Sequence, residues 1–72
     1  MSEVTEYQLN SQKFTVDHFQ KQHNKLTKEV DDAFMNNIED VEKMQMLFTI
    51  KRILSEQEEK YEQMRKVFER RD

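Results

Sequence analysis

The chain contains no glycine, proline, cysteine or tryptophan among its 72 residues. Without glycine and proline it lacks the residues that usually form tight hairpin turns and phosphate-binding loops, so long helices with few connections are expected. Without cysteine it has no disulfide or cysteine-bound metal to stabilise a chain too short to bury a large core. We therefore expect one all-α domain, residues 1–72, that gains stability by association.

Long apolar runs are also missing. No run approaches the roughly 20 residues of a membrane-spanning helix, and no hydrophobic signal-peptide core follows the N-terminus. We expect a soluble, cytoplasmic protein with no integral membrane span, although export without a cleaved signal stays open. Fifteen acidic residues stand against 12 basic ones, and Lys and Arg are interleaved with Glu. Because phosphate binding needs a clustered basic surface, nucleic acid is not an expected partner.

The second half of the chain carries a heptad pattern. Its members follow at alternating steps of three and four: Leu47, Ile50, Leu54, Gln57, Tyr61, Met64 and Phe68. This spacing places one narrow apolar stripe along a helix, the geometry by which helices pair. The single polar member, Gln57, is of the kind that fixes register or partner number in a coiled coil.

The first half of the chain carries a second stripe, at Val16, Phe19, His23, Leu26, Val30 and Ala33. Thr5 and Gln8 fit a capping box, which predicts a first helix over about residues 5–35 after a flexible start at 1–4. The alternation over residues 13–17 leaves an extended arm as the alternative for residues 5–15. Asn36 and Asn37 predict the turn, because Asn tolerates the left-handed conformation and also caps helices. Asn36 with Glu39 would cap a second helix over about residues 38–70.

Folding back at residues 36–37 predicts a two-helix antiparallel hairpin, or coiled coil, completed by oligomerisation or by a partner. The expected assembly is a homodimer or a hetero-complex with a client protein. Its expected core consists of Phe19, His23, Leu26, Val30 and Met44. Apolar residues before Val16 are sparse, so the stripe of the second helix is expected to stay partly uncovered and to bind another helix. The predicted partner-binding residues are Leu47, Ile50, Leu54, Tyr61, Met64 and Phe68.

Catalytic and metal-binding chemistry find little support in the residues. His18 and His23 are five apart, whereas helical zinc ligands usually stand four apart, and no cysteine completes a site. Two helices offer no water-excluding pocket for a nucleophile and its base. We expect no enzyme activity, no metal and no cofactor.

The segment from Ile38 to Leu47, IEDVEKMQML, resembles the start of the second helix in type III secretion needle subunits, with Val41 in place of their proline. A small acidic hairpin with a long, charged second helix is more similar to the co-chaperones that keep those subunits monomeric. The resemblance implies a co-chaperone or adaptor that covers an apolar helix of a client. The alternatives are a self-assembling structural coiled coil and a small phage or bacterial regulator that docks on an enzyme or transcription factor.

Overall fold

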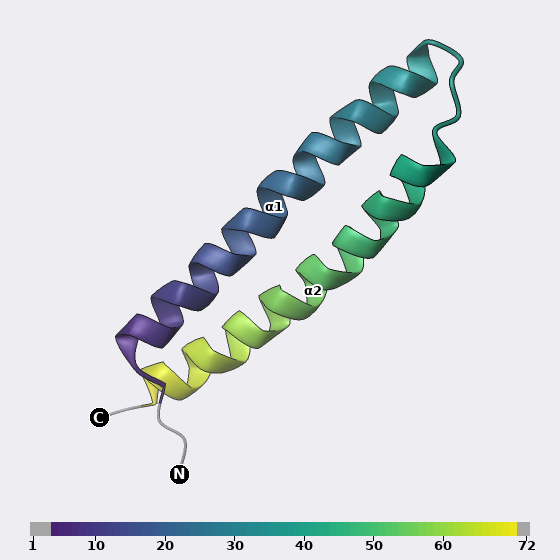
Figure 1. Cartoon of the computed structure of the whole chain (residues 1–72). Coiled ribbons are helices and arrows are strands. Elements are labelled where there is room, and N and C mark those ends of the chain that lie inside the picture. Colours follow the sequence, from purple (N-terminus) through teal and green to yellow (C-terminus); the bar gives the residue numbers. More distant parts are fainter. Residues whose placement is uncertain (1–3, 71–72) are drawn as a thin grey trace.

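The computed structural model describes residues 4–70, which form two long helices joined by one turn. Helix α1 spans Glu6–Met35 and helix α2 spans Val41–Glu69. They lie antiparallel over their whole length, with the turn at one end and the start of α1 beside the end of α2 at the other (Figure 1). The rod measures 56 × 15 × 13 Å, and no strand occurs in residues 4–70. The predicted all-α hairpin is confirmed, whereas the flexible start falls mostly on residues 1–3, outside the described chain.

Helix α1 begins at the predicted capping box. The Gln8 amide donates to Thr5 Oγ1 at 3.1 Å, and the Thr5 amide donates to Gln8 Oε1 at 3.1 Å. Two of the amide groups that a helix start leaves unpaired are thereby satisfied. Residues 6–15 are helical, so the chain does not adopt the extended arm.

The turn ends α1 with a left-handed asparagine. Asn37 has φ 58°, a conformation that costs asparagine less than most residues other than glycine. The Ile38 amide donates to the Ala33 carbonyl at 2.8 Å and the Asn37 amide to the Phe34 carbonyl at 3.0 Å. These two bonds form a Schellman motif, with asparagine in the position that glycine usually holds.

Helix α2 begins later than the sequence pattern predicts. Asp40, not Asn36, is its N-cap, and Asp40 Oδ1 accepts a hydrogen bond from the Lys43 amide at 3.1 Å. Since the Ile38 amide is bonded back to α1, the chain needs residues 38–40 to reverse direction before a new helix can start. The predicted cap of Asn36 with Glu39 is therefore corrected to Asp40, and α2 starts at Val41.

The two helices meet along one seam with heptad spacing. Only Leu26, Leu54 and Gln12 are buried within the described chain, at 7%, 6% and 7% exposure. The seam comprises these three and half-buried residues at steps of three and four: Leu9, Val16, Phe19, His23, Val30 and Ala33 from α1, and Lys43, Leu47, Ile50, Gln57, Tyr61, Met64 and Phe68 from α2. A two-helix contact covers each helix on one side only, so most other side chains stay in solvent.

Candidate protein-binding surface

The six residues predicted to bind a partner all lie in the seam. Leu54 is buried, and the other five, Leu47, Ile50, Tyr61, Met64 and Phe68, are half-buried. The half of α2 that is farther from the turn carries Tyr61, Met64 and Phe68, and it lies against the first three turns of α1 (Figure 1). Met64 lines a surface hollow with Ser11 and Gln12, and Tyr61 lines another with Val16. The helix pairing within the chain thus uses the α2 stripe, and an external helix would reach its inner side only if α1 moved.

Four of the five predicted core residues also belong to the seam. Leu26 is buried, and Phe19, His23 and Val30 are half-buried. Met44 is 51% exposed, and the seam position there belongs to Lys43. The Lys43 ammonium lies 3.9 Å from both Glu29 and Asp40, so its aliphatic part covers the seam while its charge reaches the rim.

A pair of glutamines joins the helices inside the seam. Gln12 Nε2 donates to Gln57 Oε1 at 2.9 Å and to the Gln57 backbone carbonyl at 3.0 Å. The polar residue predicted to fix register in α2 therefore has its partner in α1. Gln12 is the buried member of this pair, and a buried amide is costly unless it is hydrogen-bonded. The pair favours the one alignment of the helices that brings the two amides together.

Exposed apolar side chains gather in the half of the hairpin that contains the turn. Of the ten large apolar residues exposed in the described chain, seven lie within residues 34–48; we call them the turn-half surface: Phe34, Met35, Ile38, Val41, Met44, Met46 and Phe48. Phe48 is 78% exposed and Phe34 is 73% exposed. Large apolar side chains that are so open to water and share one half of a molecule are typical of a protein-binding surface.

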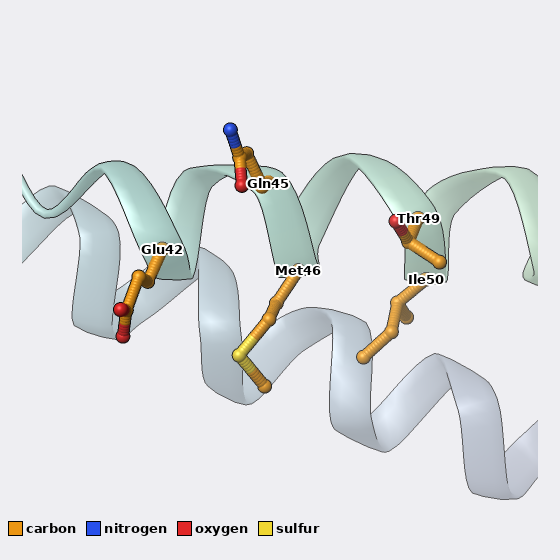
Figure 2. Close-up of a pocket in the computed structure, with 5 residues that line it drawn as sticks. All are labelled: Glu42, Gln45, Met46, Thr49 and Ile50. Atoms are coloured by element: carbon orange, nitrogen blue, oxygen red, sulfur yellow. The ribbon is translucent and has the colours of Figure 1, made fainter.

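The surface contains two depressions on different sides of α2. The turn hollow, about 240 Å³, is lined by Val30, Asp31, Phe34, Ile38, Glu39, Asp40 and Met44. An open groove of about 520 Å³ is lined by Glu42, Gln45, Met46, Thr49 and Ile50. Figure 2 shows Met46 and Ile50 projecting to one side of α2 while Gln45 projects to the other. The turn hollow and the open groove therefore provide a concave, partly apolar surface on each side of α2.

The fold also separates the charges along the rod. Residues 29–42, around the turn, hold six acidic residues and no basic one. The adjoining segments 18–28 and 43–55 hold three basic residues each and no acidic one. The expected interleaving of charges therefore holds only near the termini, where Arg65 contacts Glu62 at 2.9 Å and Glu69 at 3.9 Å. The turn-half surface has an acidic end followed by a basic band.

A metal site and a membrane-spanning helix are both absent from residues 4–70. No group of three His, Asp or Glu side chains there could hold a metal ion. Neither helix of this part of the chain is long and apolar enough to cross a membrane. Comparison with protein-family models, curated proteins and solved structures found no match to the chain.

Proposed function

We propose that the chain is a noncatalytic helical interaction protein that binds an apolar helix of another protein through its turn-half surface. The observation that carries this proposal is the concentration of exposed Phe, Met, Ile and Val side chains at residues 34–48. These side chains add no stability to the chain while they stay exposed. Each would contribute about 1.5 to 3 kcal/mol if a partner buried it fully.

The mechanism is docking of a preformed surface against an amphipathic helix, whose apolar face would lie along α2. Methionine suits this role, since its flexible side chain adapts to different partners, and Met35, Met44 and Met46 are all more than half exposed. The acidic end and the basic band would orient the partner, because opposite charges favour one direction of docking.

Within this class, the resemblance of residues 38–47 to needle subunits supports the more specific role of a type III secretion co-chaperone or adaptor. Four residues in that segment belong to the turn-half surface: Ile38, Val41, Met44 and Met46. In this role the protein would cover an apolar helix of its client and prevent premature assembly.

Photo-crosslinking in cells that produce the chain tests the proposal. A photoreactive phenylalanine analogue in place of Phe48 is expected to give a discrete covalent adduct with a different protein, whose mass differs from twice the 8.9 kDa of the chain. The matched control places the analogue at Gln63, an exposed position in the other half of α2, where no adduct is expected. Absence of an adduct at Phe48, or equal adducts at both positions, would contradict the proposal.

A further inference from the structure

We infer that the turn-half surface also binds a second copy of this chain, forming a two-fold symmetric, antiparallel dimer in which Phe48 of each copy fills the turn hollow of the other. The inference rests on the proposed function, because it assigns a partner to the same surface. Three features of the described residues support it: a projecting aromatic side chain, a hollow that fits it, and opposite charges around the two.

Phe48 is the projecting side chain. It is 78% exposed on α2, and no other aromatic residue of that helix is as open to solvent. Lys51 and Arg52 follow at i+3 and i+4, which places their side chains beside it on the helix surface. Neither cation forms an ion pair within residues 4–70. Phe48 thus projects from a basic surface whose charges are unpaired.

The turn hollow is the complementary feature. Val30, Phe34, Ile38 and Met44 supply an apolar lining, and Asp31, Glu39 and Asp40 also line it. Its volume of about 240 Å³ is of the order of one aromatic side chain with some space around it. Asp31 and Glu39 form no ion pair in the described chain, whereas Asp40 already contacts Lys43 at 3.9 Å. The hollow is therefore an apolar site with unpaired carboxylates around it.

One symmetry operation satisfies both features at once. A two-fold axis perpendicular to α2, at the height of Met46 along the helix and on the side where Met44 and Phe48 project, brings Phe48 of one copy level with Met44 of the other. The same axis brings Arg52 level with Asp40, since each residue lies about 9 Å from the axis at 1.5 Å per residue. Such an interface uses the same patch twice, so every contact occurs in duplicate. The acidic end of each copy then faces the basic band of its partner.

Sedimentation equilibrium of the purified full chain over a concentration series measures this association. The expected mass at high concentration is twice the 8.9 kDa of the single chain. Phe48→Asp is expected to weaken dimerisation at least about 100-fold, because each dimer buries two such aromatic side chains. Phe14→Asp is the matched control: Phe14 is 76% exposed but lies in the other half of α1, and this variant should dimerise normally. Circular dichroism verifies that both variants remain helical.

Charge reversal tests the orientation of the two copies. A Lys51→Glu/Arg52→Glu variant and an Asp31→Lys/Glu39→Lys variant should each dimerise poorly alone, because like charges then face each other. An equal mixture of the two should form a heterodimer, since both sets of opposite charges are restored. A mixture that stays monomeric would overturn the antiparallel arrangement.

The outcomes separate this inference from the proposed function. A wild-type chain that stays monomeric at high concentration, or a dimer that Phe48→Asp does not weaken, overturns the self-association. If Phe48 nevertheless crosslinks in cells to a different protein, the proposed interaction function stands and only its partner changes. If Phe48 yields no adduct in cells and no dimer in solution, both proposals fail.

Discussion

Leu54→Ala is expected to destabilise the hairpin by about 2 to 5 kcal/mol, the usual cost of removing a large side chain from a packed core. Leu54 is 6% exposed and is the most buried residue of α2. The seam contains only one other buried apolar residue, Leu26, so the remaining contacts have little capacity to compensate. For a small domain this loss is a large fraction of the total stability. Urea unfolding followed by circular dichroism, at a concentration where the chain is monomeric, measures it.

Phe14→Ala is the control for this experiment. It removes a larger side chain, but one that is 76% exposed, and should change the free energy of unfolding by no more than about 0.5 kcal/mol. Equal losses in the two variants would mean that the helices do not pack along the described seam.

The second large effect concerns the pairing of Gln12 with Gln57. Gln12→Leu leaves the Gln57 side chain without its 2.9 Å partner inside the seam. We expect a net cost of about 1 to 2 kcal/mol, because a polar group left unsatisfied costs more than the added apolar contact returns. A loss of similar size is expected for Gln57→Leu, because the buried Gln12 amide then keeps only its bond to the backbone carbonyl of residue 57.

The double variant Gln12→Leu/Gln57→Leu should be at least as stable as the wild-type chain, since two leucines can pack where two amides were bonded. The double-mutant cycle then gives a coupling of about 2 to 4 kcal/mol, which is the sum of the two single losses. Additive losses would show that the two glutamines do not interact. If the glutamine pair is less stable than the leucine pair, the difference is the cost of a polar contact that specifies the register of the two helices.

The heptad spacing was sufficient to predict the hairpin and most of its seam. Steps of three and four identify the buried side of each helix because a 3.6-residue turn returns them to the same face. The prediction for Met44 followed its apolar character, whereas the strict alternation continues backward from Leu47 to Lys43. Position in the repeat, and not apolar character, therefore decides that Lys43 and not Met44 enters the seam. The aliphatic part of a lysine side chain can fill a seam position while its ammonium group stays in water.

Two features required the folded chain. Gln12 continues the α1 repeat backward from Val16, but a polar residue on a helix surface usually faces water, and only its bond to Gln57 identifies its role. The basic band likewise combines two segments, 18–28 and 43–55, that are distant in sequence and adjacent in the hairpin. The turn-half surface was missed because the exposed side chains of residues 34–48 come from two helices and the turn between them.

The most direct test is whether the protein still associates when its seam is locked shut. Since the chain has no cysteine, Ser11→Cys/Lys60→Cys provides two exposed thiols that line one hollow between the helices, far from the turn. A short bismaleimide linker would join them within one chain. Sedimentation equilibrium of the linked protein should give the same dimerisation constant as the wild-type chain, because the binding surface lies outside the seam. A linked chain that has become monomeric would contradict the account and identify the seam residues of α2 as the binding surface.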